Sequence, residues 1–598
     1  MLETERLILR PWNEGDAESL YAYAKDPQVG PIAGWPVHTS IENSRDIIKS
    51  VLAVPENYAV CFKEDNVAIG CVGLVIGGKS NIKLPDDEGE IGYWIGVPFW
   101  GRGLIPEAVN RLMLRAFEDL NIKKLWCGYF DGNIKSKRVQ EKCGFKHKYT
   151  LKDIEWRLMN DIRTEHISCI TLEEWNQAIN GDAEKRRKTM SINEELVETE
   201  GIKCIKNHRA EVDQQGKVSV DGFSREVTRK VRSFHKSFPE YKVTPLRSLK
   251  ELSKALRVES VWIKDESFRF GLNAFKVLGG SYSVGNYLAK RLNMDIDKIT
   301  FDLLKSDEIR NALGDITFVT ATDGNHGRGV AWAAARLGQK SVVLMPKGSA
   351  EIRLANIQKE GADARITDLN YDDTVRLAKE YAKEIGGVII QDSVKEGYKE
   401  IPTWIMQGYT TIIDEVLEQL AENDCKAPTH VFLQAGVGAF AAAIAAYLVS
   451  AFGDKRPIII VVEPDEAACF FLSVKAGDGE PHAVTGFMPT IMAGLACGEP
   501  CDLSWKILHD YGDFFISCND DTTIEGMRTL AHPMQGDPVV VSGESGAVSM
   551  GLVKSILQKK EFEQIKKQLH IDENSRILCI STEGDTDPEN YRKICGSL

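Results

Sequence analysis

Lys276 lies among apolar residues in the segment NAFKVLGGSYS, directly before a pair of glycines. Burial disfavours the charged form of a lysine, so a lysine in an apolar pocket has a lowered pKa and can act as a nucleophile or a base. Many lysines bury only their stems and keep the ammonium group in water. Lys276 therefore indicates a catalytic site only in combination with other motifs.

A polar turn follows a predicted strand in the segment TFVTATDGNHGRG, where the strand ends at Thr320. A helix is predicted to begin near His326. The free N–H groups of a helix N-terminus bind anions, so this turn predicts a cradle for a substrate carboxylate. We interpret His326 first as a buried structural residue and second as a member of the cradle. The cradle residues are Thr322, Gly324, Asn325 and His326.

A glycine-rich turn joins a strand to a helix in the segment THVFLQAGVGAFAAA. Gly436 and Gly438 predict a phosphate-binding loop, because the free N–H groups at the start of the following helix bind anions. The motif also fits the dinucleotide fingerprint G-x-G-x-x-A, with Glu463 ending the next predicted strand as a ribose-binding acid. A Rossmann dehydrogenase is therefore the alternative for this motif. Another predicted strand, RILCIS, ends in Ser581 and Thr582.

A similar glycine turn, VPFWGRGLIPEA, occurs near the start of the chain. Gly101 and Gly103 let the backbone approach a ligand closely, and the helix that follows offers N–H groups to a pyrophosphate. A tight turn without a ligand is the alternative. Glu90 and Glu107 are candidate bases or amine-binding groups, although a surface or capping role is our first interpretation of each.

The elements that must position these residues divide the chain in two. Residues 1–176 have the strand and helix order of an α+β domain with an antiparallel tendency. Residues 201–598 alternate helices with nine predicted strands, from VESVWIKDE to SRILCISTEG, which favours parallel sheets covered by helices. Ligands collect at the carboxyl ends of such strands. The polar segment 177–200 is interpreted as a linker.

The composition is that of a multi-domain cytoplasmic enzyme. The chain has 598 residues, 43% of them hydrophobic, and a formal net charge of −13. This acidic balance argues against non-specific nucleic-acid binding, which needs a basic surface. The 13 cysteines form no CxxC pair, so we expect reduced thiols and neither disulfides nor a metal site. The apolar run 436–453 is interpreted as a buried helix and not as a membrane span.

Residues 1–176 resemble the GNAT acetyltransferases, and within them the branch that acetylates protein N-termini and related amines. The segments ETERLILRPW, IGYWIGVPFWGRGLIPEA and DGNIKSKRVQEKCGFK carry the resemblance, in that order. Ile105 stands where that family usually has Gly or Ala, so a domain that binds acetyl-CoA without turnover is the alternative. The residues that the resemblance implies for acetyl-CoA are Arg102, Gly103, Leu104, Ile105 and Asn133.

Residues 230–595 resemble the pyridoxal-phosphate enzymes of the tryptophan-synthase-β type, because the lysine, the cradle, the phosphate loop and the terminal strand follow in that order. The resemblance implies the two-lobed fold type II, with mostly parallel sheets, and a homodimer. It implies that Lys276 forms the Schiff base, that Phe275 packs beside it and that Asn325 contacts the ring hydroxyl. Ser581, or less favourably Thr582, would face the pyridine nitrogen. The phosphate would be bound by Gly436, Val437, Gly438 and Ala439.

The segments NAFKVLGG, TATDGNHG, QAGVGA and STEGDTDPENY further resemble the diaminopropionate ammonia-lyases. Asp323 stands where serine and threonine deaminases and serine racemases usually have Ser, and Asp392 ends the predicted strand GGVIIQD. The resemblance implies 2,3-diaminopropionate of either hand as the substrate, with pyruvate and ammonia as products. Carboxylates near the β-carbon would keep the leaving amine protonated. Lys276 and Asp323 would remove the α-proton from opposite faces.

Three alternatives stay open for this part of the chain. Asp323 could cap the following helix, and Asp392 could end its strand in a turn. The reaction could be that of a threonine or serine dehydratase, or of a racemase, on the same fold. The leading interpretation of the whole chain is a bifunctional fusion of an acetyltransferase and an ammonia-lyase.

Overall fold

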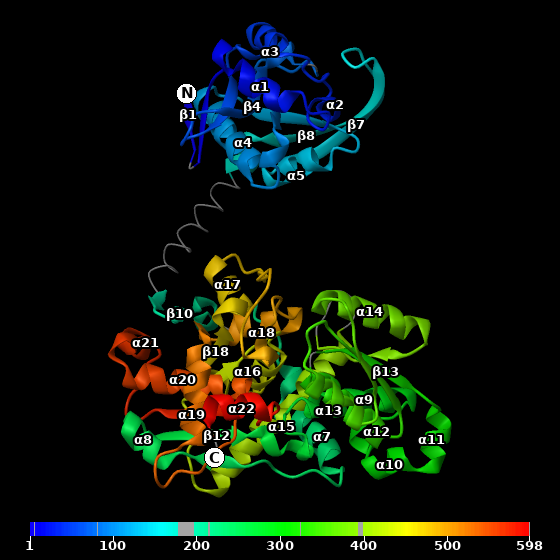
Figure 1. Ribbon diagram of the computed structural model, residues 1–598, viewed down its shortest axis with the longest axis vertical. Helices are drawn as coiled ribbons and strands as arrows, with labels where there is room; N and C mark the ends of the chain where they lie inside the picture. Colours follow the sequence, from blue (N-terminus) through cyan, green and yellow to red (C-terminus); the bar gives the residue numbers. More distant parts are fainter. Residues whose placement is uncertain are drawn as a thin grey trace. The chain divides into compact units, whose positions relative to one another are not determined.

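The computed structural model describes residues 1–4, 6–80, 82–176, 196–212, 216–322, 324–392 and 399–596. The chain forms two compact units, Met1–Arg186 and Arg187–Leu598, drawn in Figure 1. Asp323 and residues 177–195 of the expected linker lie outside the described residues. The boundary between the units falls inside the segment 177–200.

The N-terminal unit is built on a mostly antiparallel sheet with the strand order β1-β2-β3-β4-β5-β6-β8-β7. Strands β5 and β6 run parallel, and their pairing ends at Glu90 and Trp126, although both strands continue. The two strands therefore diverge, which leaves room for a ligand between them. The strands are β1 (Leu2–Glu3), β2 (Leu7–Pro11), β3 (Asn57–Phe62), β4 (Ala68–Ile76), β5 (Glu88–Ile95), β6 (Lys124–Phe130), β7 (Lys146–Trp156) and β8 (Asp161–Thr171).

Helices cover both faces of this sheet, as the alternation along β3 shows. Tyr58 and Val60 join the core that includes α4, whereas Ala59 and Cys61 join the core that includes α1. Because successive side chains of a strand point to opposite faces, each face has its own core. The helices are α1 (Ala17–Ala24), α2 (Gly30–Ala33), α3 (Ile41–Ile47), α4 (Leu104–Leu114) and α5 (Ile134–Lys142).

The C-terminal unit contains two sheets. The larger has the order β11-β12-β20-β17-β18-β19-β10-β9, in which β12, β20, β17, β18 and β19 are parallel. The smaller is fully parallel, in the order β15-β14-β13-β16. The strands are β9 (Val197–Thr199), β10 (Ile202–Lys206), β11 (Leu246–Ser248), β12 (Ser260–Asp265), β13 (Thr317–Ala321), β14 (Lys340–Met345), β15 (Asp363–Ile366), β16 (Val388–Ile389), β17 (His430–Gln434), β18 (Ile458–Pro464), β19 (Phe514–Cys518) and β20 (Arg576–Ser581).

All nine strands predicted for this unit are present, as β12 to β20. Strand β9 lies within the segment 177–200 that we expected as a linker. It pairs with β10, and Val197 is buried in the core of the larger sheet. The fold of this unit therefore begins before residue 201.

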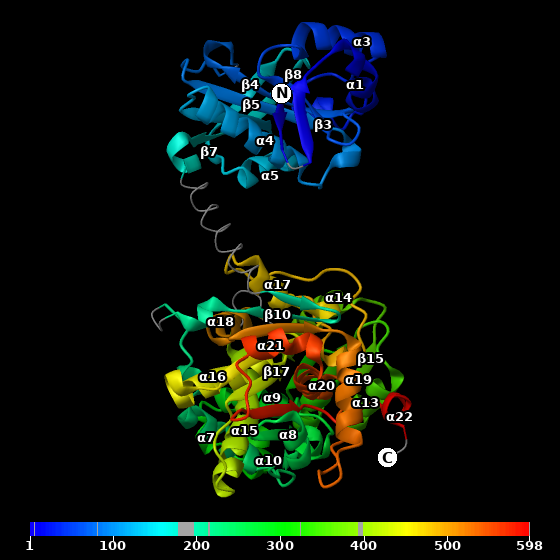
Figure 2. The same cartoon turned by 90° about the vertical axis from the view of Figure 1, so that its left-hand side faces the viewer.

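Two helical layers sandwich the larger sheet. Helix α16 belongs to the core on one face, whereas α19 and α20 belong to the core on the other, where Figure 2 shows them side by side. The apolar run 436–453 forms α16, which is buried from Ala439 to Val449, so the prediction of a buried helix is confirmed. None of the described helices is long and apolar enough to cross a membrane.

The remaining helices surround the two sheets (Figures 1 and 2). The helices of the C-terminal unit are α7 (Arg225–Lys236), α8 (Lys250–Leu256), α9 (Val277–Arg291), α10 (Phe301–Lys305), α11 (Asp307–Leu313), α12 (Asn325–Arg336), α13 (Glu351–Lys359), α14 (Tyr371–Glu384), α15 (Glu400–Glu422), α16 (Ala439–Phe452), α17 (Cys469–Ala476), α18 (Asp502–Tyr511), α19 (Asp520–Ala531), α20 (Glu544–Gln558), α21 (Glu563–Gln568) and α22 (Pro588–Cys595).

Candidate active sites

Lys276 occupies the N-cap position of α9 and forms an ion pair with Asp392. Its Nζ lies 3.1 Å from Asp392 Oδ2. Asp392 follows β16 at the carboxyl edge of the smaller sheet, and its side chain is buried. The two residues are far apart in sequence. The fold thus brings together two of the three catalytic candidates, whereas the third, Asp323, lies outside the described residues.

The charge state of Lys276 differs from the expectation. Burial lowers its pKa, but the interactions with Tyr409 and Asp392 raise it more, so the pKa lies above the usual value. The prediction of a lowered pKa from apolar surroundings is therefore wrong, because it left out the anionic partner. Burial raises the pKa of Asp392, but Lys276 lowers it below its usual value. The pair is charged at neutral pH.

Aromatic rings form one wall beside the lysine. Nζ of Lys276 lies 5.6 Å from the ring centre of Phe275 and 5.9 Å from that of Tyr409. The Phe275 ring also contacts Phe440 of α16 at a centroid distance of 5.0 Å. The site of the lysine is thus next to the helix that follows the glycine loop.

Helix α12 begins at Asn325, next to the predicted start at His326, and Gly324 is its N-cap. The backbone N–H of Gly324 donates to Thr322 Oγ1 at 3.1 Å. The amide of Asn325 donates to Glu583 Oε2 at 2.6 Å, which fixes its orientation. His326 is buried, and its Nε2 lies 3.1 Å from the carbonyl oxygen of Ile390. This contact ties α12 to the end of β16 and agrees with a structural role for His326.

The glycine loop between β17 and α16 has the geometry of a phosphate cradle. Gly438 is the N-cap of α16 with a φ of 84°, and no side chain caps the helix. The first N–H groups of the helix therefore remain available to an anion. A Cβ at Gly438 would collide with the Phe470 ring, and a Cβ at Gly436 would lie 3.1 Å from Cys497 Sγ. Val437 and Ala439 complete the loop.

Ser504 is a residue of this cradle that the sequence analysis missed. It is fully buried on α18, and its Oγ has no hydrogen-bond partner among the described residues. Its Cβ would lie 3.0 Å from a Cβ added at Gly438. A buried hydroxyl without a partner beside a loop of free N–H groups is what a bound phosphate requires. The residues present thus fit pyridoxal phosphate, with Lys276 for its aldehyde and this loop for its phosphate.

The end of β20 supplies two buried hydroxyls. Ser581 Oγ donates to Ser542 Oγ at 2.7 Å, and Thr582 Oγ1 accepts from Gln434 Nε2 at 3.1 Å. Glu583 follows them and was not predicted as a site residue. It accepts hydrogen bonds from Asn325 and from the backbone N–H of Ser545, and burial raises its pKa. Its position directly after the Ser-Thr pair was the signal available in the sequence.

The Rossmann alternative is not supported by the position of Glu463. This carboxyl is fully buried and accepts the backbone N–H groups of Phe470 and Phe471 at 2.8 and 2.7 Å. Burial raises its pKa to about 8. Glu463 therefore caps the start of α17 and does not face a ribose site.

The N-terminal unit contains a cavity of about 1380 Å³ between the diverging strands and the helices beside them. The glycine turn lies at its border, with φ of 76° at Gly101 and 72° at Gly103. Leu104 and Ile105 begin α4 and are buried in the sheet core, so the larger side chain of Ile105 is accommodated there. The Arg102 guanidinium stacks on Phe62, 5.3 Å from its ring centre.

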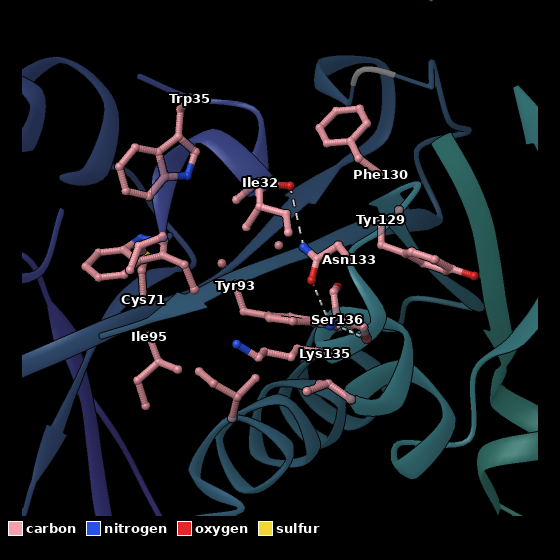
Figure 3. Close-up of a pocket in the computed structure, with 18 of the residues that line it drawn as sticks. Ile32, Trp35, Cys71, Tyr93, Ile95, Tyr129, Phe130, Asn133, Lys135 and Ser136 are labelled. Carbon is pink, nitrogen blue, oxygen red and sulfur yellow. Dashed lines mark hydrogen bonds between the residues drawn. The ribbon is translucent and has the colours of Figure 1, made fainter. Parts of the chain in front are cut away.

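Asn133 organises the wall of this cavity at the start of α5 (Figure 3). Its side-chain oxygen accepts the backbone N–H of Ser136 at 3.1 Å and caps α5, and its amide donates to Ile32 O at 3.5 Å. Tyr93 of β5 donates to the carbonyl oxygen of Ser136 at 3.0 Å. Lys135 stacks on Trp100, next to the glycine turn, with its Nζ 3.2 Å from the ring centre.

Of the two expected carboxylates of this unit, one has a structural role and one lines the cavity, where a third carboxylate joins it. Glu107 forms an ion pair with Arg6 at 2.6 Å and accepts a hydrogen bond from Thr4, so it fixes the first turn of α4. Glu90 lines the cavity and accepts a hydrogen bond from Ser80 at 2.6 Å. Glu165 on β8 also lines the cavity, and sequence analysis missed it because it lies outside the three segments that resemble the GNAT acetyltransferases.

Comparison with known proteins agrees with both sites. Residues 238–583 match the family described as pyridoxal-phosphate dependent enzyme, and residues 6–146 match the acetyltransferase (GNAT) domain. The diaminopropionate ammonia-lyase of Salmonella typhimurium is 53% identical over 369 residues, which cover 62% of this chain and 91% of that protein. The chain belongs to the diaminopropionate ammonia-lyase family. The Escherichia coli K12 member is 47% identical over 373 residues, covering 62% of this chain and 92% of that protein.

Solved structures of the family agree with the fold. The crystal structure of the holo diaminopropionate ammonia-lyase of Escherichia coli has a TM-score of 0.61 and 44% identity, covering 66% of this chain and 96% of that chain. The threonine dehydratase of Haemophilus influenzae is only 25% identical over 321 residues, which disfavours the dehydratase interpretation. The predicted family, fold type II and N-terminal GNAT domain are therefore confirmed. The match to the Salmonella relative covers 91% of that protein but only 62% of this chain. The GNAT domain is therefore a part of this chain beyond its match to that relative.

Proposed function

We propose that the C-terminal unit converts 2,3-diaminopropionate of either hand to pyruvate and two molecules of ammonia. The ion pair between Lys276 and Asp392, beside the glycine loop, is the observation that carries the proposal. The similarity to diaminopropionate ammonia-lyases supports the choice of substrate. Bound pyridoxal phosphate would withdraw electrons from the α-carbon and so make the α-proton acidic.

The chain's own residues supply the binding and the proton transfers. The first-turn N–H groups of α12, with Thr322, would bind the substrate carboxylate. Lys276 would take the α-proton from one face once it has lost its own proton, and Asp323 would do so from the other face. Asp392 would hold the β-amino group as an ammonium, which leaves as ammonia when the C–N bond breaks. Water then hydrolyses the remaining enamine to pyruvate and the second ammonia.

The test is a comparison of substrates on the purified, pyridoxal-phosphate-loaded protein. We expect pyruvate from D- and L-diaminopropionate, and at least about 100-fold less from serine, which leaves Asp392 without a cationic partner. Lys276→Ala should release no pyruvate. Asp323→Asn should reduce turnover of one enantiomer much more than that of the other. Equal losses for both enantiomers would contradict the two-face assignment.

We also propose that the N-terminal unit transfers an acetyl group from acetyl-CoA to an amine. The cavity between β5 and β6 and the open glycine turn at its border support this reaction. Binding of acetyl-CoA followed by release of CoA in the presence of an amine tests it. Binding without CoA release would favour the binding-only alternative.

The remaining expectations concern assembly. We propose a cytoplasmic homodimer formed through the C-terminal unit, without a nucleic-acid partner, in agreement with the formal net charge of −13. Light scattering of the full chain tests the dimer. A monomer at micromolar concentration would contradict it.

A further inference from the structure

The cavity of the N-terminal unit has two chemically different ends. Its cationic lining residues among the described part of the chain are all on α5, next to the glycine turn; they are Lys135, Arg138 and Lys142. Their positive charges complement the phosphate groups of acetyl-CoA, which are expected at the glycine turn. Aromatic and aliphatic side chains line the other end, and in the view of Figure 3 Trp35 and Phe130 lie on the side away from Lys135.

We call this the aromatic end of the cavity, and its aromatic side chains pack against one another. The Trp35 ring contacts Trp94 at a centroid distance of 5.8 Å, and Phe130 contacts Trp156 at 4.9 Å. His38 also lines this end, but it is buried, it pairs with Ser44 and burial lowers its pKa, so it is neutral at pH 7. Arg163 stacks on Phe130 at 4.7 Å, but it is not a lining residue of the cavity and it forms an ion pair with Asp161 at 2.7 Å. The aromatic end therefore offers no unpaired cation among its described lining residues.

Two carboxylates, Glu90 and Glu165, lie where the strands diverge. Glu165 pairs in register with Phe130 on the neighbouring strand, and a Cβ at Gly128 would collide with its carboxylate. Gly128 thus makes room for this side chain in the cavity. Glu165 accepts no hydrogen bond from any described residue, whereas Glu90 is held by Ser80. Glu165 is therefore available to an incoming group.

The surroundings of Glu165 suit proton acceptance near neutral pH. Burial raises the pKa of Glu165 to about 7, and the charge of Glu90 on β5 adds to the effect. The other titratable groups that interact with it are Cys127 of β6 and Tyr149 of β7, and both are neutral at pH 7 because burial raises their pKa values. A carboxylate with a pKa near the working pH is an effective general base.

We propose that the acetyl acceptor is a primary amine on an aromatic or apolar scaffold without a carboxylate, and that Glu165 is the base that deprotonates it. The inference rests on the proposed acetyl transfer. A free amino acid, including diaminopropionate, would bring a carboxylate to the aromatic end of the cavity, near Glu90 and Glu165, where no described lining residue is a cation. The desolvation and repulsion of that group would strongly disfavour binding.

The proton balance of this step closes without a further reactant. The acceptor enters as an ammonium, and Glu165 takes one proton from it. The free amine forms a bond to the acetyl carbon while the carbon–sulfur bond breaks. The departing CoA thiolate takes the second proton lost by nitrogen, and Glu165 releases the first to solvent. The products are the amide, CoA and one proton.

The experiment measures CoA release by the full chain with matched probes. Tryptamine and phenethylamine are compared with tryptophan, phenylalanine and diaminopropionate, at saturating acetyl-CoA. We expect kcat/KM to be at least about 100-fold higher for each amine than for the amino acid of the same ring. Equal or better use of the amino acids would overturn the acceptor class and leave the acetyl transfer intact. CoA release with none of the probes, despite acetyl-CoA binding, would overturn both.

A variant tests the role of Glu165 separately. Glu165→Gln should lower kcat for tryptamine by about 100-fold, leave the affinity for acetyl-CoA unchanged and remove the rise of activity through pH 7. Glu155→Gln is the matched control, because Glu155 is exposed on the adjacent strand β7. Unchanged kcat and an unchanged pH profile in Glu165→Gln would overturn the assignment of the base.

Discussion

At the scale of single residues, the contact between Lys276 and Asp392 determines the charge of the ammonia-lyase site before pyridoxal phosphate binds. Tyr409 and the ion pair with Asp392 together hold the pKa of Lys276 above its usual value. A lysine must lose its proton to bond to an aldehyde. Asp392 therefore slows the loading of the cofactor, while its negative charge favours a cationic amine in the substrate.

Asp392→Asn separates these two effects. Without the carboxylate, the pKa of Lys276 falls, so the cofactor-free protein should load pyridoxal phosphate several-fold faster at pH 7. Turnover of diaminopropionate should fall by about 100-fold or more, because the β-ammonium loses its partner. Loading is followed by absorbance and turnover by pyruvate release. Asp368→Asn, an exposed carboxylate that follows β15, is the control. Unchanged loading would contradict the role of the ion pair.

The residues of the site were predictable to different degrees. Lys276 and Asp392 were both expected, because each stands in a motif at a strand or helix end. Their contact was not, since sequence order does not show which strand ends meet. Glu165 and Ser504 were missed because each lies on an element without a glycine-rich motif. The sequence does not show that β8 borders the cavity of the N-terminal unit or that α18 borders the phosphate cradle.

At the scale of elements, the loop between β17 and α16 depends on the conformation of one glycine. Gly438 has a positive φ, and an added Cβ would also collide with Phe470. Nine of the twelve strands in the described part of this unit, β12 to β20, were predictable, because their apolar runs end in polar or glycine turns. Strands β9, β10 and β11 were missed. The segment IKCIK of β10 alternates, but it follows directly on the polar segment that we interpreted as a linker.

Gly438→Ala should weaken binding of pyridoxal phosphate by at least about tenfold, because the collision with Phe470 displaces the first turn of α16. Gly453→Ala is the matched control at the other end of the same helix, with a φ of 56° and open space around its Cβ. Both variants carry the backbone strain, of about 1 kcal/mol or more. Cofactor titration should distinguish them. Equal affinities would show that the loop tolerates the added methyl group.

At the scale of the whole molecule, the two candidate sites occur in two compact units. The glycine turn, the cavity and both cavity carboxylates belong to the N-terminal unit, whereas the lysine, its aspartate and the phosphate loop belong to the C-terminal unit. The described residues of each candidate site thus come from a single unit. Composition and length suggested several domains, but the net charge of −13 carries no information about either site.

The two activities should therefore fail independently in the full chain. Lys276→Ala should abolish pyruvate release and leave CoA release from tryptamine within about twofold of the unmodified chain, because its substitution changes no residue of the acetyl-CoA cavity. Glu165→Gln should show the reverse. Millimolar diaminopropionate should not inhibit CoA release, since the aromatic end of that cavity excludes a carboxylate. Loss of both activities in either variant, or strong inhibition by diaminopropionate, would mean that the sites are coupled or share a ligand.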